Sequence, residues 1–242
     1  MSKIAIFSDI HANSSALDHV IEDAYSQGVA SFACLGDIVG YGPKPSDCVT
    51  RVQELKCVCV KGNHDEYVAD SYDLSAFNAQ ARTALEWTRN NLSSGQKDWL
   101  ASLPYTRRLG RNMIVHATLD RPDKWEYIHN SFDAAIVMHH QTTPICFYGH
   151  THVPVTYEMH GNSAKVVTND TVQIQNGCKY LINTGSVGQP RDGDPKASYV
   201  IFDRVERTVQ FRRVEYDIQT VADDIVSVGL PNSLADRLIK AS

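Results

Sequence analysis

Residues 3–11 read Lys-Ile-Ala-Ile-Phe-Ser-Asp-Ile-His, an apolar run that ends in an aspartate and a histidine two positions apart. A short apolar run bounded by polar residues predicts a buried strand, here over residues 3–8. Apolar residues then recur at helical spacing between Asn13, which can cap a helix, and Gly28, which can end one. Further along, the same reasoning predicts strands over 31–35 and 57–60 and a helix over 45–55. This alternation implies parallel strands joined by right-handed crossovers.

The second part of the sequence has a different pattern. Residues 73–103 have helical spacing, with a break between two helices expected at Gly95. Between residues 153 and 214, short alternating segments are separated by turn dipeptides such as Gly161-Asn162 and Asn176-Gly177, which predict antiparallel hairpins.

Together these patterns predict an α/β protein with a four-layer α/β/β/α sandwich of two packed mixed sheets flanked by helices. Short apolar strands are also expected over 112–115 and 145–148, and two short helices over 217–240. We expect residues 1–242 to form a single domain, since no linker or repeat divides the chain.

The composition narrows the class of protein. Hydrophobic residues make up 43% and charged residues 21% of the 242, as in ordinary globular proteins. No apolar run approaches the roughly 20 residues of a membrane span, and no signal-peptide cleavage site is visible, so we expect a cytoplasmic protein without a membrane partner. The formal net charge of −5 argues against a broad nucleic-acid surface. None of the six cysteines forms a Cys-x-x-Cys pair, which disfavours a thiolate zinc site.

Polar clusters follow five of the expected strands. They are Asp9-Ile-His11, Gly36-Asp37, Gly62-Asn63-His64-Asp65, His116 and Gly149-His150-Thr-His152. Because ligands bind outside the carboxyl ends of strands in open parallel sheets, we expect these clusters to converge on one rim. In extended backbone, residues two apart point to the same side, so Asp9 with His11, and His150 with His152, could each hold one cation. We expect the five remaining histidines to be surface or structural: His19, His129, His139, His140 and His160.

The donor types indicate which cations would bind. Carboxylate, imidazole and amide donors without thiolate suit Mn, Fe, Zn, Co or Ni better than calcium. Six or seven candidate donors exceed the need of one catalytic ion with open positions, so two divalent ions are expected, about 3.5–4 Å apart when a carboxylate bridges them. Such a cluster is net positive and favours anionic substrates.

The ordered set D-x-H, G-D, G-N-H-D, H and G-H-T-H resembles the calcineurin-like metallophosphoesterase superfamily. Residues 36–43 and 183–195 resemble its small prokaryotic phosphodiesterase branch. The resemblance implies two divalent ions, most often Mn or Fe, and a metal-bridging hydroxide that attacks phosphorus. It also implies metal ligands at seven positions: Asp9, His11 and His152 for the first ion, Asn63, His116 and His150 for the second, and Asp37 as the bridge.

The same resemblance implies a catalytic role for His64. This residue would face the substrate and either stabilise charge or protonate the leaving oxygen. Asp65, its neighbour in the sequence, is the second candidate catalytic residue.

The sequence departs from the serine/threonine phosphatases of the superfamily, which carry G-D-x-V-D-R-G after the second strand. Their second Asp supports the catalytic histidine and their Arg grips phosphoryl oxygens, whereas this chain has Gly40-Tyr41-Gly42 in those positions. A free phosphate monoester is nearly dianionic at neutral pH, so its binding depends more on contact with such an arginine than the binding of a diester does. The departure therefore favours hydrolysis of phosphodiester or phosphoanhydride bonds in small nucleotides. The alternatives are a phosphomonoesterase or nuclease, and a non-catalytic protein-binding scaffold of the same fold.

Two further residues are candidates for substrate binding. Arg191 lies in a Gly/Pro-rich loop, where it could bind phosphate or form a salt bridge with Asp192 or Asp194. Tyr41 belongs to a group of aromatic residues whose loops follow ligand segments. These residues could stack on a nucleobase or simply pack against the core: Tyr41, Trp125 and Tyr127.

Overall fold

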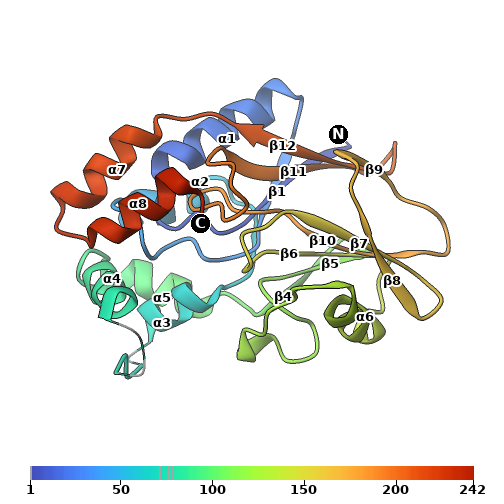
Figure 1. Ribbon diagram of the computed structural model, residues 1–242, viewed down its shortest axis with the longest axis horizontal. Coiled ribbons are helices and arrows are strands. Elements are labelled where there is room, and N and C mark those ends of the chain that lie inside the picture. Colours follow the sequence, from blue (N-terminus) through green and yellow to red (C-terminus); the bar gives the residue numbers. More distant parts are fainter. Residues whose placement is uncertain (1, 71, 76, 78) are drawn as a thin grey trace.

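The computed structural model describes residues 2–70, 72–75, 77 and 79–242. Two six-stranded mixed sheets pack face to face, and helices cover their outer faces (Figure 1). The expected four-layer sandwich is confirmed.

The first sheet has the strand order β3-β2-β1-β11-β12-β9. Its strands are β1 (Lys3–Phe7), β2 (Ser31–Cys34), β3 (Val58–Cys59), β9 (Thr171–Gln173), β11 (Ala197–Asp203) and β12 (Thr208–Val214). The first three are parallel, and the crossovers between them are α1 (Ser14–Ser26) and α2 (Pro45–Glu54). The remaining strands are joined by antiparallel pairing, with β11 against β1.

The second sheet has the order β4-β5-β6-β10-β7-β8. Its strands are β4 (Thr106–Leu109), β5 (Asn112–Val115), β6 (Ile145–Tyr148), β7 (Val155–His160), β8 (Ser163–Val167) and β10 (Lys179–Asn183). Strands β5, β6 and β10 are parallel. The expected hairpin at Gly161-Asn162 is confirmed, because His160 pairs with Ser163.

The prediction of a hairpin at Asn176-Gly177 is wrong. The strands on either side of that turn belong to different sheets, since β9 pairs with β12 and β10 pairs with β6 and β7. The turn residues are those of a hairpin, but the pairing partners lie far away in the sequence. The turn therefore carries the chain from one sheet to the other.

The other helices are α3 (Asn63–Ala69), α4 (Ala79–Asn90), α5 (Ser94–Ser102), α6 (Ser131–His140), α7 (Ile218–Ser227) and α8 (Asn232–Lys240), with a 3-10 turn η1 over Pro122–Lys124. The helix break expected at Gly95 lies slightly earlier: Ser93 caps α5 through a capping box with Gln96, so Gly95 is inside the first turn. No described helix combines the length and apolar character that a membrane crossing requires.

Side-chain alternation along the strands separates three apolar layers. In β1, Ile4 and Ile6 point into the space between the sheets, whereas Ala5 and Phe7 point toward the helices that cover the first sheet. A third cluster joins the second sheet to α6. Both sheets are thus held rigidly on two faces, and their strand ends can position side chains accurately.

Candidate dinuclear metal centre

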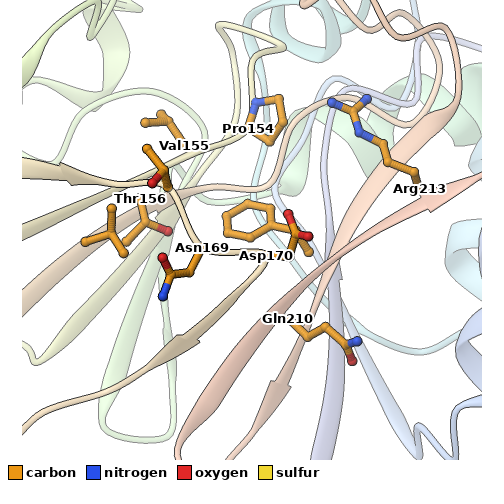
Figure 2. A pocket seen from close by; sticks show the side chains of 10 residues that line it. Pro154, Val155, Thr156, Asn169, Asp170, Gln210 and Arg213 are labelled. Atoms are coloured by element: carbon orange, nitrogen blue, oxygen red, sulfur yellow. The ribbon is translucent and has the colours of Figure 1, made fainter.

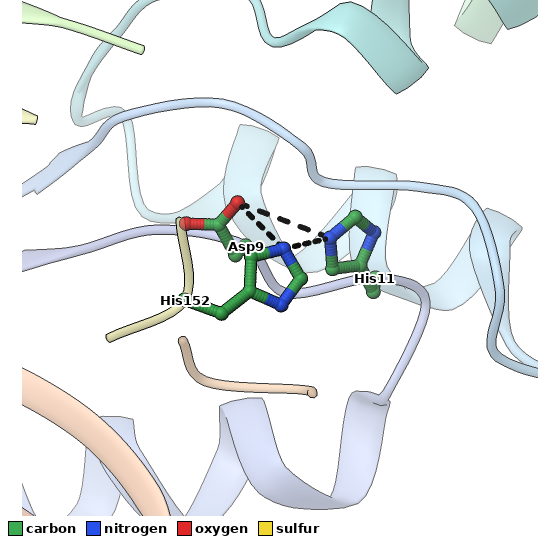
Figure 3. A group of neighbouring side chains, drawn as sticks. All are labelled: Asp9, His11 and His152. Atoms are coloured by element: carbon green, nitrogen blue, oxygen red, sulfur yellow. Dashed lines mark hydrogen bonds and ion pairs between the residues drawn. The ribbon is translucent and has the colours of Figure 1, made fainter. Parts of the chain in front are cut away.

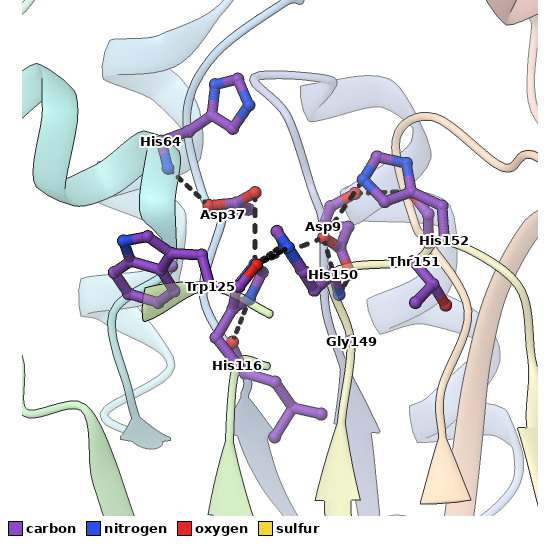
Figure 4. Close-up of polar contacts among 12 residues, drawn as sticks. Asp9, Asp37, His64, His116, Trp125, Gly149, His150, Thr151 and His152 are labelled. Carbon is purple, nitrogen blue, oxygen red and sulfur yellow. Dashed lines mark hydrogen bonds and ion pairs between the residues drawn. The ribbon is translucent and has the colours of Figure 1, made fainter. Parts of the chain in front are cut away.

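The five polar clusters meet where β1, β2, β3, β5 and β6 end, at one edge of the sandwich (Figure 4). Hydrogen bonds link the loops to one another: the amide of Asp9 donates to Gly36 O at 3.0 Å, and the amide of His150 donates to Asp9 Oδ2 at 3.0 Å. The first hydrogen bond joins two loops that follow strands of the first sheet. The second joins a loop of the first sheet to a loop of the second. The rim therefore draws its side chains from both sheets.

One group of donors consists of Asp9, His11 and His152 (Figure 3). The Nε2 atoms of the two histidines lie 3.0 Å apart, and Asp9 Oδ1 lies 3.3 Å from His152 Nε2 and 3.8 Å from His11 Nε2. Metal–nitrogen bonds of about 2.0–2.1 Å place neighbouring ligand atoms roughly 3.0–3.4 Å apart, so these separations suit a common ion.

A second group consists of Asp37, His116 and His150. His150 Nδ1 lies 3.2 Å from His116 Nε2, and Asp37 Oδ2 lies 3.4 Å from His116 Nε2. The same Oδ2 atom is 3.6 Å from His11 Nε2 of the first group. Asp37 therefore stands between the two groups, as a bridging carboxylate would.

Backbone carbonyls fix which nitrogen of each ring is free. The Nδ1 atoms of His11, His116 and His152 contact Val39 O, Leu35 O and Gln189 O, while His150 uses Nε2 to contact Trp125 O. If each contacting nitrogen donates its proton, the other nitrogen of the neutral ring is a lone pair. In the first group the lone pairs of His11 and His152 then face each other, and in the second group those of His116 and His150 do so when both rings are neutral. A cation between the two nitrogens of a group would make this arrangement favourable. These carbonyls carry no side-chain signal, so sequence reasoning did not identify them.

Asn63 supports the same interpretation. It is the first residue of α3, and its Oδ1 atom is buried without a hydrogen-bond partner among the described residues. A buried acceptor without a partner is costly unless something absent from the chain satisfies it. The donor set of carboxylate, imidazole and amide therefore fits two divalent cations.

Backbone conformation corrects one sequence argument. The His150 and His152 pair was expected to bind one cation together from extended backbone, but both residues have left-handed φ values of 66° and 61°. Asp9 and His11 are left-handed as well, with φ values of 54° and 47°. The left-handed residues redirect the side chains, so His150 and His152 belong to different groups.

Burial and neighbouring charge set the protonation of the centre. Burial raises the pKa of Asp9 and of Asp37, but the neighbouring imidazoles outweigh it and leave both values below the ordinary one. Burial lowers the pKa of His64 to about 4 and that of His150 to about 3. For His116, burial is outweighed by the charge and hydrogen bond of Asp37, and the pKa rises to about 9. Imidazoles thus surround two charged carboxylates, and the second proton that the raised pKa leaves on His116 lies where a cation could bind instead.

Asp65 has a different role from the one expected. Its buried carboxylate accepts hydrogen bonds from the amides of Ile38, Val39 and Gly62 at 2.9, 3.3 and 3.0 Å. Its two oxygens face these amides, so they are not directed at a substrate position. Asp65 is a positioning residue that ties the loop after β2 to the start of α3, because a buried carboxylate seeks the nearest amide donors.

His64 and Tyr41 lie beside the first group. The amide of His64 donates to Asp37 Oδ1 at 2.8 Å, and its Nδ1 atom is buried without a partner among the described residues. The ring of Tyr41 lies 4.4 Å from that of His64 and 4.7 Å from that of His11, centroid to centroid. A Cβ atom at residue 40 would lie 2.4 Å from His64 Nδ1, so this position requires glycine.

Arg191 is close to the centre. Burial lowers the pKa of His152 and of His64, and the positive charge of Arg191 lowers both further. Its Nη2 atom donates to Gln189 Oε1 at 3.1 Å. The alternative salt bridge with Asp192 or Asp194 is not formed, because both carboxylates pair with Arg213.

Cavities elsewhere do not contribute to this centre. One of about 450 Å³ lies beside β7 and β12, lined by residues that include Thr156, Asp170 and Arg213 (Figure 2). Another of about 640 Å³ lies at the opposite ends of β6 and β10. Neither is lined by a residue of the two donor groups.

Comparison with known proteins points to one family. The sequence model described as a calcineurin-like phosphoesterase superfamily domain matches residues 2–207. An uncharacterized protein of Methanocaldococcus jannaschii is 38% identical over 241 residues, which cover 98% of this chain and 97% of that protein.

Solved structures agree. The crystal structure of a metallophosphoesterase from Sphaerobacter thermophilus is 40% identical, with a TM-score of 0.88, and the match covers 100% of this chain and 99% of that one. A hypothetical protein from Pyrococcus horikoshii is 20% identical with a TM-score of 0.81, over 100% of this chain and 99% of that one, and this likeness concerns the fold alone.

Proposed function

Because the chain belongs to the calcineurin-like phosphoesterase superfamily, whose members hydrolyse phosphoesters with bound metal, we propose that it cleaves phosphodiester or phosphoanhydride bonds of small nucleotides. Its activity would be that of a phosphodiesterase, and its partner would be a small phosphate-ester substrate. Mn or Fe would be the usual ions, with Zn, Co or Ni as substitutes.

One observation carries the choice of bond. The phosphatase-type Asp and Arg are replaced by Gly40-Tyr41-Gly42, and the Tyr41 ring packs against His11 and His64 instead. The loop after β2 thus supplies no guanidinium to a phosphoryl group. A diester carries one negative charge where a monoester carries nearly two, so it depends less on such a contact.

The residues of the chain have distinct roles in this proposal. When bound, two divalent ions would supply positive charge at the phosphoryl oxygens and a water of lowered pKa. The seven donors named above would hold them. His64, whose backbone is fixed by Asp37, would lie over the leaving oxygen and stabilise its charge or provide its proton, while Asp65 keeps both loops in place.

A phosphomonoesterase is the second candidate, and the position of Arg191 favours it. The amide of Arg191 donates to His152 O at 3.3 Å, and its guanidinium has no carboxylate partner among the described residues, so it could contact a phosphoryl oxygen from a different loop. The complete donor set argues against the non-catalytic scaffold, for which buried lone pairs facing each other would bring only cost.

The test compares two esters with the same leaving group. The purified protein, loaded with Mn, is assayed against bis(4-nitrophenyl) phosphate and 4-nitrophenyl phosphate. We expect kcat/KM for the diester to exceed that for the monoester by about tenfold or more, a difference of about 1.4 kcal/mol in transition-state binding.

Two variants act as controls. Arg191→Gln should leave diester hydrolysis within a few-fold of the parent, and His19→Ala, on the exposed face of α1, should change neither ester. A parent that prefers the monoester, and loses that preference in Arg191→Gln, would establish the second candidate. Fewer than about one ion per chain, without hydrolysis of either ester, would favour the scaffold.

A further inference from the structure

The exposed ring of Tyr127 lies at the edge of the metal centre. It belongs to the segment between β5 and α6, and 48% of the residue is exposed. Its ring centroid is 4.2 Å from that of His150, and the ring is parallel to that of His129 at 5.4 Å, with an angle of 4° between the planes. An aromatic surface accessible to solvent therefore begins directly beside a donor of the second group.

Contacts of Trp125 with donor histidines hold the segment that carries Tyr127 against the metal centre. Trp125 has a left-handed φ of 56°, and its carbonyl contacts His150 Nε2 at 2.9 Å. The Trp125 ring packs on His116 at 5.8 Å and on Tyr105 at 5.7 Å. Tyr127 is thus positioned before any ligand arrives, so stacking on it costs little loss of freedom.

The three aromatic candidates of the sequence now differ. Tyr41 packs against His11 and His64 on one side of the centre, and the Trp125 ring is engaged with His116 and Tyr105. Neither is among the strongly exposed aromatic residues, whereas Tyr127 is. Only Tyr127 combines contact with a donor histidine and a large accessible surface.

We propose that Tyr127, extended by His129, stacks against the base of a nucleotide whose phosphate lies at the metal centre. This inference rests on the proposed function and names the residue that would bind the base of such a nucleotide. Because the Tyr127 ring contacts that of the donor His150, a ligand whose phosphate lies at the donors would have its remaining parts close to Tyr127. Stacking uses the flat face that every base has, so the surface would select for a base without distinguishing one base from another.

Binding measurements test the inference independently of turnover. Calorimetry on the Mn-loaded protein compares adenosine 5′-monophosphate with ribose 5-phosphate, which carries the same phosphate and sugar without the base. We expect the parent to bind the base-carrying ligand roughly 5- to 100-fold more tightly. Tyr127→Ala should reduce this preference to within about twofold, and Tyr127→Trp should restore it. Tyr25→Ala, which removes another exposed tyrosine, on α1, should retain it.

Other outcomes overturn the inference. Equal affinities in the parent, or an undiminished preference in Tyr127→Ala, would show that no base stacks there. A variant that loses affinity for both ligands equally, without rescue by Trp, would assign Tyr127 a structural role only. If the parent binds the nucleotide more tightly but cleaves neither nitrophenyl ester, the stacking inference stands and the proposed function is wrong. If it cleaves the diester but binds both ligands equally, the proposed function stands and the stacking inference is wrong.

Discussion

The two ends of the sandwich build their turns differently. At the end that carries the metal centre, left-handed backbone is adopted by Gly36 and Gly40 but also by five residues with polar side chains: Asp9, His11, Asp37, His150 and His152. At the opposite end, where strands β2, β5 and β10 begin, it falls mainly on glycines, with Lys56 and Arg207 as exceptions: Gly28, Gly110, Gly161 and Gly177. Left-handed backbone costs a non-glycine residue about 1 kcal/mol or more. Strain is thus concentrated where the chemistry lies.

Cross-links between loops hold the strained end in place. The Asp9 carbonyl accepts hydrogen bonds from the Gly188 amide at 2.9 Å and from Ser186 Oγ at 2.7 Å. The Gly149 amide donates to His116 O at 2.9 Å. At the opposite end, the turns at Gly110 and Gly161 are short connections between paired strands. The difference indicates that the centre is rigid because many contacts oppose its strain, and the following predictions test that view.

The largest effect is expected for Asp37→Ala. Removing the carboxylate that lies between the donor groups should lower the metal content from about two ions per chain to below one and reduce hydrolysis by at least about 1,000-fold. Metal analysis by mass spectrometry and steady-state kinetics measure the two quantities. Unchanged metal content would mean that Asp37 does not bridge.

Asp65→Ala should have the largest effect on stability. Three amides would lose their buried acceptor, which should lower the free energy of unfolding by about 2–4 kcal/mol. Urea denaturation measures the loss. Asp65→Asn, which keeps acceptor capacity on one oxygen, should recover part of it. A loss below about 1 kcal/mol would contradict the view that this contact holds the strained loops together.

The ion pair of Asp23 with Arg212 lies away from the metal centre and can be compared with the contacts of Asp65. Burial would raise its pKa, but hydrogen bonds from Arg212 at 2.8 and 3.1 Å and from Tyr199 outweigh burial and lower it. A carboxyl group whose pKa is lowered by folding stabilises the protein at pH values above its pKa in the unfolded chain, which is near 3.9. This stabilisation is lost as the pH falls through the lower pKa of the folded protein. Asp23→Asn should therefore lower the free energy of unfolding by about 1–2 kcal/mol at pH 7. The difference from the parent should shrink below about pH 4, as urea titrations at several pH values would show.

Gly110→Ala tests the opposite end. A Cβ atom there would meet nothing within 4 Å, so only the left-handed φ of 63° opposes the change. We expect a loss of about 1 kcal/mol in unfolding free energy with unchanged hydrolysis. Gly95→Ala is the matched control, because this open glycine lies in α5, where alanine should stabilise.

The smallest effect is expected for Ala12→Gly. Ala12 is buried beside the centre with a left-handed φ of 54°, so glycine should relieve strain and raise the free energy of unfolding by up to about 1 kcal/mol. Ala16→Gly, in regular α1 backbone, should instead destabilise by about 1 kcal/mol. Equal destabilisation of both variants in thermal unfolding would show that residue 12 carries no strain.

Much of the fold was predictable because its elements obey local rules. The alternation of strands and helices up to β3 predicted the parallel part of the first sheet, and the Gly161-Asn162 turn predicted a hairpin. The hairpin predicted at Asn176-Gly177 was wrong because a dipeptide does not determine how strands from distant segments pair. Of the site residues, the sequence placed the metal-type donors on one rim, and the family resemblance grouped His150 with His116, whereas the argument from extended backbone paired His150 with His152. The direction of Asp65 was not predicted. This direction and the grouping of His150 depend on left-handed backbone and on backbone amides and carbonyls, which leave no trace in residue type.

Each donor group draws on both sheets. Asp9 and His11 follow β1 of the first sheet and meet His152 from beyond β6 of the second, while Asp37 of the first meets His116 and His150 of the second. Ions held there would act as two cross-links between distant parts of the chain, and unfolding would have to release them. A ligand that binds only the native state adds stability with its free concentration. Resistance of this protein to heat and proteases should therefore follow the metal supply of its surroundings.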